Sequence, residues 1–549
     1  MRPFPLLVVL LLILGAQASS PAQAKGLPSV YVFGDYRSAS SFFLAMKPGD
    51  RIVISEDIPS TVEQLKKMGF PAKIGSSKAI SVEINPHDLA YILLYSKENG
   101  LRMTDLGSLL ERSTLISREL SSRESEVAVL FYSSDGPDYS LLAAYAAFLK
   151  KAKLIDLDSI QPSRDVLDGV RHVILLTKPL TSTNYKRYQD VVDSLISLDD
   201  DPYLDASLGI LTGPDVAIPF LMLLSNDAAS RGLIHKLRGI SLVEDLPLAR
   251  KVEFIAQSYG LNAKILHPDV KYSNLTKDDS IEILKDARNS IIYLNLHGNP
   301  YVMALRTEGN VILTPSIVRS AEPLASVVIT LSCDTLRFPE IRDPKSSIAY
   351  SFLGAGAFAY IGATRIEFSI GSEAGTSFPD LILMMALTGH TLGEAVMVVN
   401  NLHIKESLEK GISPRQAAYE VLLGDPTLSL SSHDLPYRTG GDHGVYEVSI
   451  LGTTPVIYLQ LPVPRESDLL PNVEADLPSI YFKWYRDERG LFIYVSTLSS
   501  SFSGYFREDT DVRIELRGRY GYLEYVPYLA IILVTVLSLV VLIRARRHA

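Results

Sequence analysis

Two short apolar runs, each the length of one buried β-strand, end in side chains that can take part in covalent chemistry. Residues 291–296 are followed by His297 and Gly298. Residues 326–332 are followed by Cys333, the single cysteine among 549 residues. Runs of this length favour strands buried inside a parallel sheet. Since reactive groups in open parallel sheets gather beyond the carboxyl ends of strands, both side chains are expected at that edge.

A lone cysteine with a histidine elsewhere in the chain is a candidate nucleophile and its base. The thiolate is the attacking form, and His297 can take the thiol proton and later pass it to a leaving amine. For the oxyanion we expect the backbone N–H groups of Gly298 and Cys333 as donors. The alternative is a buried structural cysteine and a histidine that merely ends a strand. No close His/Cys/Asp cluster suits zinc, so we expect no required cofactor.

The stretch over residues 127–435 alternates short apolar strands with helical segments. We expect strands at 127–132 and 172–176, with a helix over 139–151 between them. This alternation favours a parallel sheet with helices on both faces. The fold class predicted for the chain is therefore α/β, with a parallel-sheet core over residues 127–435.

A smaller α/β unit is expected before this core, over residues 25–121. Its pattern predicts a helix over 61–68 and strands at residues 30–33, 51–54 and 90–94. A charged, serine-rich joint at 118–126 separates the unit from the core and could be cut. The unit is therefore expected to be either a prosegment or a docking module.

The sequence pattern changes over residues 445–518, where short predicted strands are separated by turns rich in glycine, proline and charged residues. Strands are expected at residues 445–450, 455–459, 479–485 and 491–495. This spacing predicts a small β-sandwich. We expect it to act as a spacer between the core and the membrane, with a membrane-proximal binding module as the alternative.

The two ends of the chain predict its location. Residues 1–24 have the layout of a secretory signal peptide, and residues 526–543 form a charge-free run long enough to cross a bilayer as one helix. The arginines in the tail at 544–549 place that tail in the cytoplasm. We expect a single-pass cell-membrane protein whose body is extracytoplasmic. The alternatives are an uncleaved anchor at the start and a buried core helix at the end.

The net charge of −9 comes without a basic stripe, so nucleic acid is not an expected partner. An acidic run, 199–205, includes Asp199, Asp201 and Asp205, whose carboxylate oxygens could hold calcium as a structural ion. The alternative for this run is a solvated acidic turn.

The order of several motifs resembles the gingipain family of cysteine peptidases, within the caspase–legumain–gingipain clan. In that clan a His-Gly pair follows one buried strand and the cysteine follows the next. The blocks that carry the resemblance are 199–205 followed by 208–209, 296–298, 331–334, 354–365, 392–395 followed by 400–401, and 423–428.

The resemblance implies a caspase/gingipain-like core and a cysteine peptidase acting on proteins or peptides, with His297 and Cys333 as its catalytic residues. Two blocks depart from the family pattern, Gly209-Ile210 and Asn299-Pro300-Tyr301, and both concern the substrate pocket rather than the dyad. Two rival functions stay open. One is a transpeptidase or transamidase of the same clan, and the other is a non-catalytic surface binding protein on a peptidase fold.

Overall fold

The computed structural model describes residues 27–242, 246–267, 276–305, 311–365, 378–442, 444–477, 480–497 and 505–518. The expected signal peptide at 1–24, the expected membrane helix at 526–543 and the tail at 544–549 lie outside these residues. Within the part of the chain that the structure describes, no helix is both long enough and apolar enough to cross a membrane.

A ten-stranded sheet forms the centre of the molecule, in the order β5-β4-β6-β7-β16-β15-β14-β10-β8-β9. Neighbouring strands pair in parallel within β5 to β7 and within β15 to β9, whereas β16 pairs antiparallel with β15. The bounds are β4 Val127–Phe131, β5 Lys153–Asp156, β6 His172–Leu176, β7 Ser207–Leu211, β8 Lys236–Ser241, β9 Asn262–Leu266, β10 Ser290–Asn295, β14 Val327–Thr330, β15 Ala359–Ala363 and β16 Glu420–Leu423. The parallel-sheet core predicted from the alternating pattern is therefore present.

Helices cover both faces of this sheet and supply much of the buried core. β10 and β14 are buried along their whole length, which explains their continuous apolar sequence. The main helices of the core are α7 Pro137–Lys150, α9 Lys186–Ile196, α10 Ala217–Met222, α11 Ser225–Ala229, α12 Leu246–Ser258, α13 Lys277–Lys285, α14 Pro315–Ala321, α15 Ile348–Gly354, α16 Pro379–Leu387 and α17 Leu392–Glu409.

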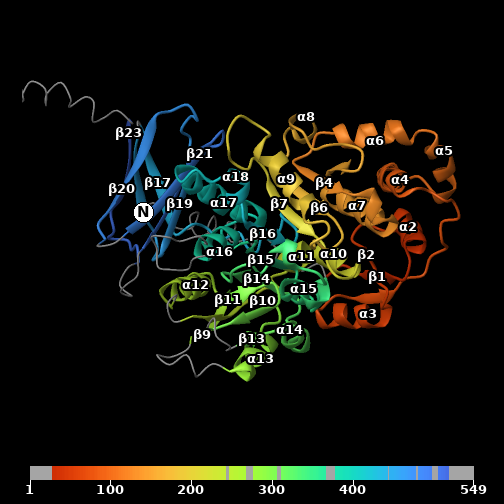
Figure 1. Cartoon of the computed structure of the whole chain (residues 1–549), viewed down its shortest axis with the longest axis horizontal. Coiled ribbons are helices and arrows are strands. Elements are labelled where there is room, and N and C mark those ends of the chain that lie inside the picture. The colour runs from red at the N-terminus through yellow and green to blue at the C-terminus, as the bar shows by residue number, and fades with distance from the viewer. Residues whose placement is uncertain are drawn as a thin grey trace, which may run out of the picture.

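The N-terminal unit lies at one side of the core (Figure 1). Its three strands form a parallel sheet in the order β2-β1-β3. Its elements are β1 Val30–Phe33, α2 Tyr36–Ala45, β2 Arg51–Ile54, α3 Ile58–Lys67, β3 Ala72–Ile74, α4 Pro86–Glu98, α5 Leu106–Leu110 and α6 Ser113–Ser122. Among the described residues, three ion pairs join the unit to the core: Arg51–Asp227 at 2.7 Å, Lys67–Glu322 at 3.2 Å and His87–Asp156 at 2.6 Å.

The strand predicted at residues 90–94 is wrong, because these residues belong to helix α4. The Asn85 side chain accepts a hydrogen bond from the Asp88 N–H at 2.9 Å, and Pro86 occupies the first turn. These are helix-start signals. The helix is buried on most of its surface, so its sequence lacks the polar stripe that would have distinguished it from a buried strand.

The joint at 118–126 is helical over its first part, since α6 extends to Ser122. The Arg123 guanidinium pairs with Glu98 at 2.8 Å and also donates to the Ala152 carbonyl. The Ser125 hydroxyl donates to the Lys151 carbonyl at 2.9 Å. This segment is therefore bonded to the two residues that precede the edge strand β5.

The C-terminal unit lies at the opposite side of the core from the N-terminal unit (Figure 1). It consists of two antiparallel sheets, ordered β17-β18-β23-β20 and β19-β22-β21. The bounds are β17 Tyr437–Asp442, β18 Val445–Ile450, β19 Val456–Leu461, β20 Leu469–Ala475, β21 Ile480–Asp487, β22 Gly490–Thr497 and β23 Val512–Gly518. Buried polar contacts tie it to the core, including Tyr494 hydroxyl to Asp380 at 2.9 Å and Lys251 ammonium to Ser496 at 2.9 Å.

Candidate active site

The register of β10 and β14 brings the two candidate residues to equivalent positions. Leu294 on β10 is the partner of Thr330 on β14. His297 follows Leu294 by three positions, and Cys333 follows Thr330 by three positions. The Leu331 N–H donates to the Leu294 carbonyl at 2.8 Å, so the two chains stay together beyond the ladder. Both side chains therefore lie past the carboxyl ends of adjacent parallel strands.

Gly298 lies directly against the backbone of Cys333. A Cβ atom at position 298 would lie 2.8 Å from the Ser332 Cβ and 3.0 Å from the Cys333 carbonyl oxygen. A side chain at position 298 would therefore push the two loops apart. His297 is exposed and Cys333 is half-buried, so the site opens to solvent on the histidine side.

His297 is held on a short strand. β11 His297–Asn299 pairs antiparallel with β12 Val302–Ala304, which pairs in turn with β13 Val311–Leu313. This three-stranded sheet fixes the backbone of the histidine.

The departure from the family pattern at 299–301 has a structural role. The Asn299 side chain accepts hydrogen bonds from the N–H groups of Tyr301 at 2.8 Å and Val302 at 3.1 Å, which closes the turn between β11 and β12. The Tyr301 hydroxyl donates to the Glu340 carbonyl, in the loop that follows Cys333. Sequence reasoning missed this link between the two loops, because asparagine before proline signals a turn but not its tertiary partner.

The chain reverses direction immediately after Cys333. The Asp334 N–H donates to the Arg365 carbonyl at 3.0 Å, and the Leu336 N–H donates to the Ala363 carbonyl at 2.9 Å. Residue numbers rise from 334 to 336 while those of their partners fall from 365 to 363, so residues 334–336 return antiparallel to the end of β15. Cys333 therefore stands at the turn between an outgoing strand and a returning segment.

Three buried polar atoms at or just past the carboxyl ends of β10 and β14 have no hydrogen-bond partner among the described residues. They are the Asn295 Oδ1, Ser332 Oγ and Thr335 Oγ1 atoms. Buried polar groups without partners are uncommon in folded proteins and call for a local explanation. Sequence reasoning did not single out these three residues, and no motif in the chain signals them.

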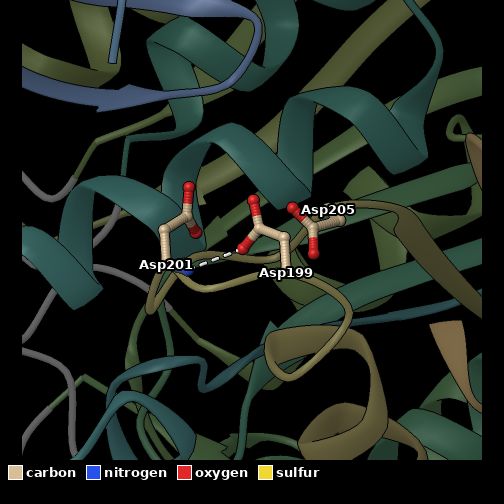
Figure 2. A group of neighbouring side chains, drawn as sticks. All are labelled: Asp199, Asp201 and Asp205. Atoms are coloured by element: carbon tan, nitrogen blue, oxygen red, sulfur yellow. Dashed lines mark hydrogen bonds between the residues drawn. The ribbon is translucent and has the colours of Figure 1, made fainter. Parts of the chain in front are cut away.

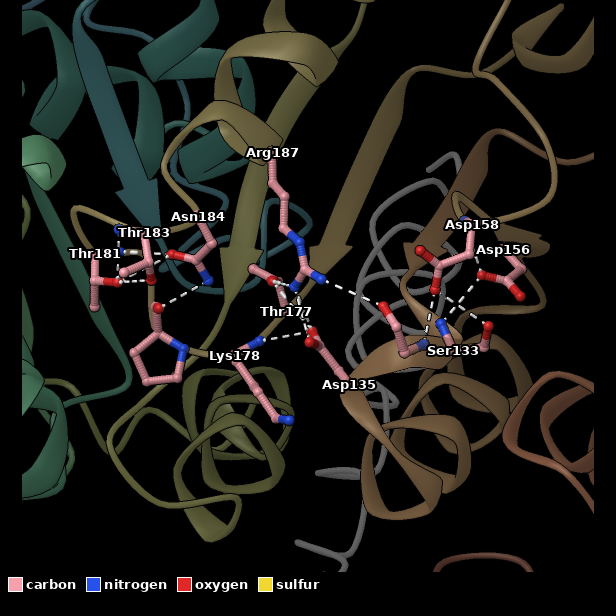
Figure 3. A network of polar contacts seen from close by, with 12 residues as sticks. Ser133, Asp135, Asp156, Asp158, Thr177, Lys178, Thr181, Thr183, Asn184 and Arg187 are labelled. Atoms are coloured by element: carbon pink, nitrogen blue, oxygen red, sulfur yellow. Dashed lines mark hydrogen bonds and ion pairs between the residues drawn. The ribbon is translucent and has the colours of Figure 1, made fainter.

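The carboxyl edge of the other half of the sheet is different (Figure 3). There Asp135 accepts hydrogen bonds from the Arg187 guanidinium at 2.8 Å and from the Lys178 N–H at 2.9 Å. The Asp156 carboxylate accepts from the Ser133 N–H at 3.1 Å. Arg187 and Asp135 pair with each other, and Asp156 pairs with His87 of the N-terminal unit. The loops of the two halves meet, since the Ser182 N–H donates to the Ile341 carbonyl at 2.9 Å.

The structure brings the three predicted acidic residues together (Figure 2). Carboxylate oxygens of Asp199, Asp201 and Asp205 lie within 4.8 Å of one another. Burial, reinforced by the neighbouring carboxylates, raises the pKa of Asp201 to about 6 and that of Asp205 to about 8. Arg465 approaches Asp199 at 3.2 Å, and the Oδ2 atoms of Asp201 and Asp205 have no hydrogen-bond partner among the described residues. Oxygen ligands crowded in this way suit a hard cation such as calcium.

The motif at 423–428 is structural. The buried Asp425 carboxylate pairs with Lys150 at 2.5 Å and accepts a hydrogen bond from Asn226 at 2.7 Å. Gly209 has no room for a side chain, since a Cβ atom there would lie 2.4 Å from the Gly424 carbonyl oxygen. These contacts join β7 to the end of β16, away from Cys333.

The motif at 392–395 is a helix cap. The Thr391 hydroxyl accepts from the Glu394 N–H at 3.1 Å, and the Glu394 carboxylate accepts from the Thr391 N–H at 2.9 Å. Asn401, further along the same helix, accepts from the Leu204 N–H at 2.8 Å and so ties the acidic run to α17.

Residues 252–431 match the family model of Peptidase family C25. The match supports a cysteine-type peptidase. Both His297 and Cys333 lie inside the matched stretch. No curated protein matches the chain.

Solved structures that are similar to the chain have low sequence identity. The crystal structure of the Arg-specific cysteine proteinase gingipain R is 10% identical, with a TM-score of 0.43, covering 70% of this chain and 94% of that one. The complex of the Porphyromonas gingivalis RgpB pro- and mature domains is also 10% identical, with a TM-score of 0.43, covering 69% and 94%. A third structure, described as a protease, is 12% identical, with a TM-score of 0.40, covering 72% and 98%.

Proposed function

We propose that the protein is an endopeptidase in which Cys333 is the nucleophile and His297 the general acid and base. The observation that carries the proposal is the register of β10 and β14, which brings the two residues to equivalent positions past adjacent strand ends. The exposure of His297 leaves room for a substrate on that side.

The proposed reaction has two half-steps. His297 takes the thiol proton, and the thiolate attacks the carbonyl carbon of the scissile peptide bond. The oxyanion accepts hydrogen bonds from the N–H groups of Gly298 and Cys333, and collapse transfers the proton from His297 to the leaving amine. Water, deprotonated by His297, then cleaves the thioester, which releases the carboxylic acid and restores the thiol.

Cys333→Ala and His297→Ala test the proposal on a peptide library. Each substitution is expected to lower kcat by about a thousandfold or more, and the double variant is expected to lose little beyond either single one, because the two groups act as a unit. The control is His235→Ala, which removes another exposed histidine near the opposite end of the same sheet. Full activity in Cys333→Ala, or additive losses in the double variant, would contradict the dyad.

The same assay separates hydrolysis from transamidation. An added primary amine is expected to leave the carboxylic acid as the main product. Amide as the main product would replace hydrolysis by transfer, with the same two residues retained.

We also propose that Asp199, Asp201 and Asp205 hold a calcium ion that stabilises the junction between the core and the C-terminal unit. The fit rests on crowded carboxylates whose Oδ2 atoms at Asp201 and Asp205 have no hydrogen-bond donor among the described residues. Arg465, from the C-terminal unit, lies beside the cluster. Calcium is expected to raise the unfolding temperature of the wild type and not of Asp201→Asn. An equal rise in both proteins would mean that calcium acts elsewhere.

We further propose that residues 526–543 anchor the protein in the cell membrane with the catalytic body outside the cytoplasm. The support is the charge-free run and the arginines that follow it. Removing residues 526–549 is expected to release an active soluble protein. A truncated protein that stays on membranes, or a body protected from protease on intact cells, would contradict this location.

A further inference from the structure

Asp334, the residue after the proposed nucleophile, has a left-handed backbone with φ of 54°. Four other non-glycine residues of the described chain also have positive φ: Lys151, Asn289, Glu322 and Ala325. Each of those four lies shortly before the amino end of a strand of the central sheet. Asp334 alone among the five follows a carboxyl end, where the site lies. A left-handed residue is unfavourable for most side chains, although aspartate and asparagine tolerate it best.

The left-handed conformation is what turns the chain at Cys333. The Asp334 N–H donates to the Arg365 carbonyl at 3.0 Å, and from Asp334 the chain returns along β15, where the Leu336 N–H donates to the Ala363 carbonyl at 2.9 Å. With an extended or right-handed backbone at position 334, the chain would leave the end of β15 and the hydrogen bond from Leu336 to Ala363 would break.

The returning segment packs between Gly298 and Gly362. The Thr335 side chain is fully buried. A Cβ atom at Gly298 would lie 3.1 Å from the Thr335 Cγ2, and a Cβ atom at Gly362 would lie 2.7 Å from the Thr335 Oγ1. The segment is thus confined from the histidine strand and from β15 together, so a change of backbone at Asp334 has to move Cys333.

The Asp334 side chain is also held. It is only 15% exposed, and its carboxylate lies 3.8 Å from the Arg337 guanidinium, one turn further along. Burial raises the pKa of Asp334, and the Arg337 charge opposes this shift. The side chain therefore packs into the turn instead of pointing into solvent.

We propose that Asp334 is a positioning residue for the Cys333 thiol and that it acts through its left-handed backbone. The inference rests on the proposed function of Cys333. Asp334 supplies no atom to the reaction. Its conformation sets where the thiol stands relative to His297.

Three substitutions at one position separate backbone from charge. Asp334→Gly and Asp334→Asn keep access to the left-handed region but remove the charge, whereas Asp334→Ala removes both. We expect Asp334→Ala to lower kcat about tenfold with little change in KM, and to slow alkylation of Cys333 by iodoacetamide at neutral pH. Asp334→Gly and Asp334→Asn are expected to recover most of both rates.

Asn289→Ala is the matched control. Asn289 has a φ of 55° and lies just before β10, at the amino end of the strand that leads to His297. The same loss of left-handed preference is expected to lower the unfolding temperature there and leave kcat unchanged. A fall in kcat for Asn289→Ala equal to that for Asp334→Ala would show a general effect of stability and overturn the proposal.

Two further outcomes would also overturn the positioning role. Equal losses in Asp334→Ala, Asp334→Gly and Asp334→Asn would show that charge and not backbone matters, and wild-type rates in all three would show no role. These outcomes differ from failure of the proposed function, which would appear as activity in Cys333→Ala.

Discussion

Polar residues lie beyond the carboxyl ends of the strands in both halves of the central sheet, but their pairing and exposure differ. Beyond β4 and β6, the Asp135 carboxylate is paired with Arg187 and with a backbone N–H (Figure 3). Beyond β10 and β14, His297 is exposed, and Ser332 and Thr335 carry buried hydroxyl oxygens without hydrogen-bond partners among the described residues. Parallel strands place polar groups at this edge, and exposure decides which of them, here His297, a substrate can reach.

The edge beyond β4 and β6 is therefore expected to contribute to stability, and the edge beyond β10 and β14 to catalysis. Removing the partner of a buried, paired carboxylate costs stability, and the carboxylate oxygens already accept hydrogen bonds from the protein. Substitutions in the first half are therefore expected to change unfolding, whereas substitutions in the second half are expected to change turnover.

Gly298→Ala should give the largest effect among the variants that leave both proposed catalytic side chains in place. The added methyl group would lie 2.8 Å from the Ser332 Cβ, so the histidine and cysteine loops have to separate. We expect a loss of about a hundredfold in kcat, from misplacement of the reacting groups. Gly107→Ala is the control, since nothing lies within 4 Å of a Cβ atom there. Wild-type turnover in Gly298→Ala would show that the close approach is not needed.

Arg187→Met tests the carboxyl edge of the other half of the sheet, beyond β4 and β6. It leaves the Asp135 carboxylate, which is 3% exposed, without its cation. We expect a loss of about 3 kcal/mol in unfolding free energy, measured by denaturant titration, with kcat per folded molecule unchanged. Arg415→Met breaks a pair with Asp193 that is 41% exposed on both sides and should cost less than about 1 kcal/mol. A fall in kcat for Arg187→Met at full folding would erase the contrast between the two edges.

The smallest effect is expected from His87→Asn, at the outer end of the same network. The hydrogen bond to Asp156 raises the pKa of His87 and, against the effect of burial, contributes to lowering that of Asp156. The stabilisation is therefore present below the unfolded histidine pKa of about 6.5, is lost as pH rises through the folded value, and is lost again in acid as Asp156 protonates.

Unfolding temperatures measure this pH dependence. We expect His87→Asn to unfold about one or two degrees below the wild type near pH 5.5, and at nearly the same temperature near pH 9. A deficit that is the same at both pH values would mean that His87 contributes by packing alone.

The sequence predicted the strands that carry the site because both are continuous apolar runs bounded by polar residues. It also predicted the C-terminal strands β18, β19, β21 and β22, where period-two patterns and turn residues are strong. It failed at 90–94, where a helix buried on most of its surface resembles a buried strand. Local pattern cannot distinguish the two when no face is left polar.

Two features of the site are invisible in sequence. The register that aligns Leu294 with Thr330 depends on pairing between strands, which a single sequence does not encode locally. The turn at Asp334 involves a hydrogen bond to Arg365, which is distant in the sequence. The grouping of Asp199, Asp201 and Asp205 could be predicted from the sequence, because these residues are neighbours in the chain as well as in space.

Covalent trapping tests most directly whether the open edge is the reactive one. The protein is treated with a peptidyl acyloxymethyl ketone, and the modified residue is identified by mass spectrometry alongside residual activity. We predict one adduct, on Cys333, with activity lost in proportion to labelling, and much slower labelling in His297→Ala. Full activity after stoichiometric modification of Cys333, or no labelling of Cys333 in an active preparation, would contradict the account.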